Sequence, residues 1–75
     1  MNMGTRIKEL RTIRGIKATF VANKIGVSQP LLSMIEREKQ NPTIPQLISL
    51  SDFFGVSIDY LVKGVNYETG NRNIV

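Results

Sequence analysis

The residues best suited to recognition chemistry lie in one short stretch, residues 27–37. At about 100° per residue, Leu32 and Ile35 share one side of a predicted helix, with Leu31 beside them. An amide, a hydroxyl, a thioether and a guanidinium occur on the opposite side, which consists of Gln29, Pro30, Ser33, Met34 and Arg37. An amide near a helix start and an arginine at its end suit the reading of DNA base edges and phosphates. For this helix taken alone, an ordinary solvated face is the alternative.

The sequence that precedes this helix has the pattern of another helix followed by a tight turn. Residues 17–25 form that helix, and Gly26 ends it. Its apolar stripe consists of Val21, Ala22 and Ile25. Ser28 can then cap the next helix, and Pro30 falls in the first turn, where its missing N–H costs nothing. This is the connection of a helix-turn-helix, whose second helix enters the major groove of DNA.

Three further helices are predicted from capping residues and apolar spacing. They span residues 5–14, 43–54 and 58–63. Thr43 and Gln46 have the spacing of a capping box, and Ser57 can cap the last helix. Glycines that can adopt the left-handed conformation follow all three, at Gly15, Gly55 and Gly64. The predicted fold is therefore all-α, with five helices.

Length and composition set the limits of function. Seventy-five residues make one domain, predicted at 1–64, with a tail at 65–75 that is either frayed or packed on a partner. With no cysteine and no histidine, zinc sites and histidine-based catalysis are excluded, and we expect no metal or cofactor. Ser28, Ser33 and Asp52 have no catalytic base beside them, so no enzyme and no small-molecule ligand are predicted. No segment approaches the ~20 apolar residues of a membrane span, and we expect a cytoplasmic protein.

The positive charge is concentrated in the first half of the chain. Residues 1–40 hold eight basic and three acidic side chains, a net charge of +5, whereas residues 41–75 hold two basic and three acidic ones, a net charge of −1. This asymmetry indicates one side that faces a polyanion and another that faces something else.

Taken together, these motifs resemble the Cro/CI-type helix-turn-helix domain of the XRE family of phage and bacterial transcription regulators. The resemblance covers residues 6–62 and rests on the ordered segments Arg6-Ile7-Lys8-Glu9-Leu10-Arg11, Gly15-Ile16, Val21-Ala22, Ile25-Gly26-Val27-Ser28, Leu32-Ser33, Ile35-Glu36, Asn41-Pro42-Thr43 and Phe53-Phe54-Gly55-Val56-Ser57-Ile58-Asp59-Tyr60-Leu61. It implies a five-helix, lambda-repressor-like domain that binds double-stranded DNA sequence-specifically. It also implies a homodimer on a palindromic operator.

The resemblance assigns roles to particular positions. The expected base-reading residues are Gln29, Pro30, Ser33 and Met34. Independently of the resemblance, phosphate contacts are expected from the helix ends and the loop that flank the predicted recognition helix, at Lys17, Arg37, Lys39, Gln40 and Asn41. Arg11 and Glu36 correspond to a structural ion pair. The glutamine that usually grips a phosphate in the second helix is replaced here by Ala18, beside Lys17. Pro30 makes no bidentate contact, and Met34 offers only apolar contact, for example to a thymine methyl.

Two kinds of partner contact are predicted from the apolar residues. Phe54, Ile58 and Leu61 are expected inside the core, which leaves Tyr60 and Val62 for a two-fold dimer contact. Phe53 or the tail is expected to add to that contact. The alternative function is a protein-interaction module, an antitoxin or anti-repressor partner, that uses an apolar patch of Ile13, Phe20 and Met34.

Overall fold

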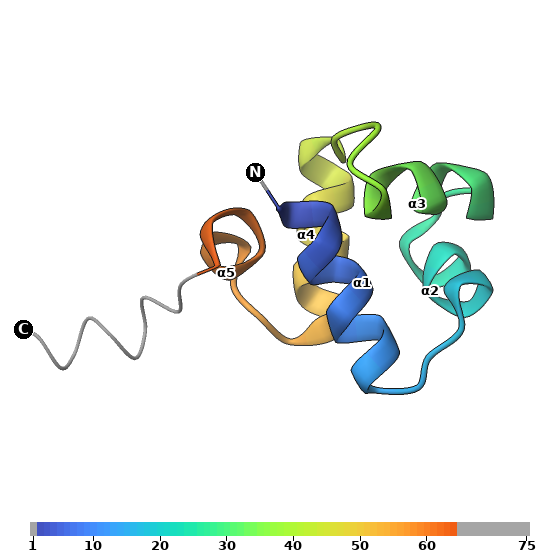
Figure 1. The fold of residues 1–75 in the computed structure, drawn as a ribbon, viewed down its shortest axis with the longest axis horizontal. Helices are drawn as coiled ribbons and strands as arrows, with labels where there is room; N and C mark the ends of the chain where they lie inside the picture. Colours follow the sequence, from blue (N-terminus) through green and yellow to red (C-terminus); the bar gives the residue numbers. More distant parts are fainter. Residues whose placement is uncertain (1, 65–75) are drawn as a thin grey trace, which may run out of the picture.

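The computed structural model describes residues 2–64, which form five helices and no strand. They are α1 (Met3–Ile13), α2 (Ala18–Ile25), α3 (Gln29–Glu36), α4 (Ile44–Phe54) and α5 (Ile58–Lys63). In Figure 1, α1 and α4 lie at the centre, with α2 and α3 at one end and α5 at the other. The prediction of an all-α, five-helix fold is confirmed.

Three helices begin at side-chain caps that the sequence predicts. The Ser28 hydroxyl accepts a hydrogen bond from the backbone N–H of Leu31 at 3.2 Å, at the start of α3. Thr43 and Gln46 form the reciprocal capping box of α4, with bonds of 3.3 and 2.9 Å. The Ser57 hydroxyl accepts from Tyr60 N–H at 3.0 Å at the start of α5. Each cap satisfies an N–H that has no partner inside the helix, so these boundaries depend on local chemistry.

Helix α1 begins at Met3, two residues earlier than the sequence predicts. Asn2 precedes it without a side-chain capping bond, so no local signal marks this start. Both Met3 and Gly4 are buried, and a Cβ at Gly4 would collide with the carbonyl oxygen of Ile35 at the end of α3. The helix starts early because its first turn packs directly on α3, and only a glycine permits that approach.

We therefore expect Gly4→Ala to lower the free energy of unfolding by about 1–3 kcal/mol, because the new methyl group meets backbone that cannot move aside cheaply. Denaturant unfolding measures the change. At an unconstrained helical position the same substitution stabilises by roughly 0.5–1 kcal/mol, so the sign of the effect is diagnostic. The exposed Lys8→Ala serves as the control, and a stabilised Gly4→Ala variant would contradict the close approach.

One core joins all five helices. Its buried apolar side chains are Met3, Ile7, Val21, Ala22, Ile25, Leu32, Ile35, Leu47, Leu50, Phe54 and Leu61. Helix α3 packs against both α1 and α2, while α5 packs against α1 and α4. The expectation that Phe54 and Leu61 lie inside is confirmed, whereas the same expectation for Ile58 is wrong, since that side chain is 38% exposed. Helix α5 has only six residues, and its Leu61 faces the core while Ile58 stays at the margin of its first turn.

The aromatic side chain of Phe20 is half-exposed on α2. Its ring lies 6.1 Å from that of Phe53, which in turn stacks edge-on against Phe54 at 4.9 Å. Phe20 and Phe53 therefore pack across α2 and α4 within the domain.

Within residues 2–64 no helix has the length and apolar character needed to cross a membrane. The same residues bring no three potential metal-binding side chains together. The predicted tail, residues 65–75, lies outside the described part of the chain.

Candidate nucleic-acid interface

Helix α3 has two chemically distinct sides. Leu32 and Ile35 are fully buried, and this stripe anchors the helix on α1 and α2. On the other side, Gln29, Pro30 and Met34 are exposed, and Ser33 is partly exposed. An amide, a hydroxyl and a thioether are thus presented to solvent on a helix whose opposite side is fixed in the core.

The turn between α2 and α3 fixes how the two helices meet. Gly26 adopts a left-handed conformation with φ 78°, and Val27 N–H donates to Ala22 O at 2.9 Å. Val27 is half-buried against the core, just before the Ser28 cap. The helix, glycine turn and capped helix predicted from the sequence are all present, which places the two helices in helix-turn-helix succession.

An ion pair holds α3 in place from its inner side. Arg11 of α1 donates from Nε to Glu36 Oε2 at 2.7 Å and from its second terminal nitrogen to Glu36 Oε1 at 2.9 Å. A third bond runs from Arg11 to the carbonyl oxygen of Ile16 at 3.1 Å. The hydrogen bond with Glu36 raises the pKa of the Arg11 guanidinium, although burial opposes that shift. The predicted pair is present, and it joins α1, α3 and the turn between α1 and α2.

Five exposed polar residues precede or follow α3 in the sequence. They are Lys17 at the start of α2, Arg37 at the end of α3, and Lys39, Gln40 and Asn41 in the following loop. These are the residues expected to contact phosphates. All five side chains reach solvent, so none is withdrawn into the core.

Two charged residues make long-range contacts that no pattern in the sequence predicts. Arg6 donates to the carbonyl oxygens of Leu61 and Val62, both at 3.0 Å, and so caps the end of α5. Glu38 accepts from the backbone N–H and the hydroxyl of Thr5 at 2.9 and 3.1 Å, at the start of α1. That backbone N–H holds the pKa of Glu38 below its usual value. Arginine at the end of a helix and glutamate at the start of a helix both interact favourably with the helix dipole. Each of these residues is far in sequence from its partner, so no local pattern predicts the contact.

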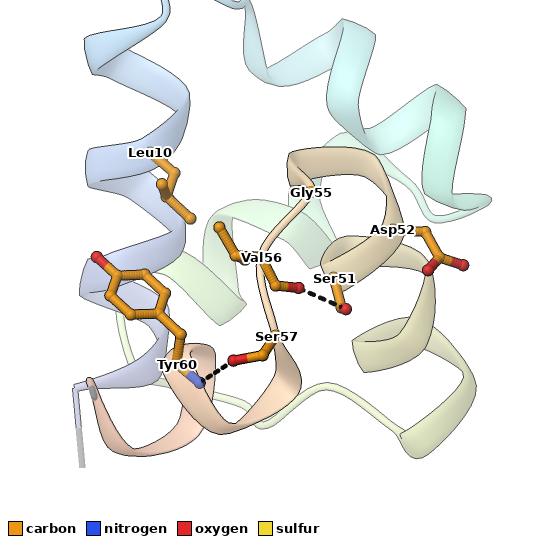
Figure 2. Close-up of a pocket in the computed structure, with 7 residues that line it drawn as sticks. All are labelled: Leu10, Ser51, Asp52, Gly55, Val56, Ser57 and Tyr60. Atoms are coloured by element: carbon orange, nitrogen blue, oxygen red, sulfur yellow. Dashed lines mark hydrogen bonds between the residues drawn. The ribbon is translucent and has the colours of Figure 1, made fainter. Parts of the chain in front are cut away.

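The three residues predicted to contact a second copy, Phe53, Tyr60 and Val62, have different neighbours within the domain. Phe53 packs beside Phe20 and Phe54, whereas Tyr60 lines a hollow of about 540 Å³ on the other side of α4, with Leu10 and Val56. Figure 2 shows Tyr60 and Leu10 directed into the space between α1 and the segment that joins α4 to α5. Val62 lies two residues further along α5, where side chains two apart do not face the same way. Tyr60 and Val62 are both partly exposed.

Known proteins share both the sequence and the geometry of this domain. A family profile described as helix-turn-helix matches residues 7–61. The chain is 34% identical to the HTH-type transcriptional regulator DdrOP3 of Deinococcus deserti over 67 residues, which cover 89% of this chain and 52% of the relative. The chain thus spans about half the length of the curated relatives it matches.

Two solved structures have the same fold. The P22 c2 repressor in complex with a synthetic operator has a TM-score of 0.82 and 34% identity, covering 87% of this chain and 98% of that one. The N-terminal DNA-binding domain of SinR from Bacillus subtilis has a TM-score of 0.74 and 39% identity, covering 81% and 90%. With the capped α3, the glycine turn and the Arg11–Glu36 pair, these matches show that the chain belongs to the Cro/CI-type (XRE) helix-turn-helix family of transcription regulators.

Proposed function

We propose that this protein is a transcription regulator that binds a palindromic operator in double-stranded DNA as a homodimer and acts as a repressor in the cytoplasm. The observation that carries the proposal is the open side of α3, where Gln29, Ser33 and Met34 are presented on a helix fixed by Leu32 and Ile35. Its relative, the P22 c2 repressor, is known in complex with an operator, which supports the same use of this fold.

The proposed mechanism is occupancy of the operator. Two α3 helices of a dimer enter successive major grooves, about 34–36 Å apart, and exclude polymerase from the site. Base contacts specify the sequence, while contacts to phosphates fix the register of the protein on the duplex. Pro30 and Met34 offer no hydrogen-bond donor to a base edge. Much of the binding affinity therefore comes from contacts to phosphates and from recognition of DNA shape.

Gln29 is the strongest candidate for direct reading, since an amide pairs bidentately with adenine. We expect Gln29→Ala to weaken binding to the preferred site by about 1–3 kcal/mol and to relax the preference at one base pair. Selection of bound sequences from random duplex DNA, with the parent and the variant in parallel, measures both effects. Binding to random DNA is the internal control and should not change. An unaltered preference would remove Gln29 from the reading role.

Lys39 is expected to contact the DNA backbone from the loop after α3. Lys39→Ala should weaken binding about equally on preferred and random DNA and reduce the log–log salt slope by roughly one. Affinity titrations at several salt concentrations give the slope. Lys63→Ala is the control, because it removes the same charge from α5, which lies at the opposite end of the domain from α3 (Figure 1). A loss confined to the preferred site would place Lys39 on a base instead.

A protein-interaction module remains the second candidate, because Ile13, Phe20 and Met34 are 82%, 50% and 37% exposed. Salt dependence separates the two candidates. Binding of duplex DNA falls steeply as salt is raised, whereas an apolar protein contact does not. Failure to bind any duplex at low salt would favour the interaction module.

A further inference from the structure

The loop that leaves α3 contains an unusual backbone conformation. Glu38 has φ 63°, and it is the one non-glycine residue with a positive φ among residues 2–64. The bonds around it define the turn, because Glu38 N–H donates to Ile35 O at 3.1 Å and Lys39 N–H donates to Met34 O at 2.8 Å. This is the Schellman pattern of a helix end, in which the left-handed position is usually a glycine. A glutamate there takes on a conformation that its Cβ disfavours.

The carboxylate of Glu38 explains how that conformation is held. Oε2 accepts from Thr5 N–H at 2.9 Å and from the Thr5 hydroxyl at 3.1 Å. Thr5 lies in the first turn of α1, whose N–H groups have no partner within the helix. Asn2 makes no side-chain cap, and this first turn contains no acidic residue. Glu38 therefore supplies both the cap and the negative charge that the start of α1 lacks.

Gly4 makes this contact possible. Because it has no Cβ, the first turn of α1 reaches the carbonyl oxygen of Ile35, the same atom that accepts from Glu38 N–H. The start of α1 and the end of α3 thus meet at one carbonyl group. Because these two helix ends are in contact, the Glu38 side chain is long enough to bridge the end of α3 and the start of α1.

Resting on the proposed DNA-binding function, we propose that Glu38 is a positioning residue for the contact with the DNA backbone. Its bridge to Thr5 holds the neighbouring Arg37 and Lys39 in the conformation that meets phosphates. Both of these cationic side chains are exposed, and the turn that carries them is joined to α1 through the bonds between Glu38 and Thr5. The negative charge of Glu38, which would otherwise repel a phosphate, is directed to the positive end of α1.

The test compares Glu38→Gly with the parent on a mixed-sequence DNA duplex, by fluorescence anisotropy across a salt series. Glycine adopts the same φ without strain but removes the bridge to Thr5. Simple electrostatics predicts tighter binding, since one negative charge is lost near the DNA. We expect binding weaker by about tenfold and a salt slope lower by roughly one, because phosphate contacts from the loop are lost. Binding as tight as that of the parent, or tighter, would overturn the inference.

Two conservative variants separate positioning from general destabilisation. Glu38→Gln keeps an oxygen that can accept hydrogen bonds from Thr5, so its affinity for DNA should be within about threefold of that of the parent. Thr5→Val removes only the bond from the hydroxyl, so its loss of affinity should be intermediate. Amide hydrogen exchange at Thr5 and Lys39 should accelerate in Glu38→Gly, with the rest of the core unchanged. Equal losses for Glu38→Gln and Glu38→Gly would overturn the bridge as the cause. Glu9→Gln controls for charge, since that exposed residue lies in the middle of α1.

The interaction with Lys39 completes the test. If Glu38 acts through this loop, Lys39→Ala should reduce the affinity for DNA by a smaller factor in the Glu38→Gly background than in the parent. Fully additive losses would contradict that route. A parent protein that shows no salt-dependent DNA binding refutes the proposed function itself, whereas a parent that binds alongside an unimpaired Glu38→Gly variant refutes this inference alone.

Discussion

Arg11→Met is expected to lower the free energy of unfolding by about 3–5 kcal/mol. The substitution leaves the carboxylate of Glu36 without its partner, and that side chain is only 6% exposed. A buried unpaired charge costs far more than the net contribution of an intact pair. Small domains are stable by only about 5–15 kcal/mol, so the variant loses a large share of its total stability. Chemical denaturation at low temperature measures the change.

The double variant Arg11→Met with Glu36→Leu is the decisive comparison. Apolar residues of similar volume often replace a buried ion pair at little cost, so this variant should recover most of the lost stability. An exposed control, Glu9→Ala, should change stability by no more than about 0.5 kcal/mol. A cost below about 1 kcal/mol for Arg11→Met alone would mean that Glu36 is solvated and that the pair does not fix α3.

Tyr60→Glu is expected to reduce affinity for a palindromic operator by about 10²–10⁴-fold. Joining two binding modules can raise the affinity by about 10²–10⁴-fold, and in this protein the proposed dimer contact joins them. Tyr60 lines the hollow with Leu10 and Val56 and is partly exposed, so a carboxylate there reaches water without unfolding the domain. Analytical ultracentrifugation should show a monomer, with helicity unchanged by circular dichroism.

A duplex that carries a single half-site provides the internal control. The added negative charge alone would weaken both duplexes, whereas loss of the dimer weakens only the palindrome. Val62→Glu probes the other flank of α5 in the same assay, because Tyr60 and Val62 do not share a face. If both variants bind the palindrome as the parent does, the two-fold contact lies elsewhere on the protein.

The sequence alone determined the features that depend on neighbours three or four residues apart. The caps by Ser28, Thr43 and Ser57, the glycine ends at Gly26 and Gly55, and the two sides of α3 all follow local rules. Hydrogen-bond chemistry and helical periodicity operate within one turn, so a single sequence contains all the information they need. The ion pair between Arg11 and Glu36 was different, because only the family resemblance pointed to it.

The tertiary structure decided the contacts made between helices that are remote in sequence. Glu38 reaches Thr5 across 33 residues, and Arg6 reaches the end of α5 across 55 and 56. The early start of α1 and the exposure of Ile58 likewise depend on how helices are oriented against one another. Such contacts arise when packing of the core brings two helix ends together, and no periodicity or cap along the chain encodes that orientation.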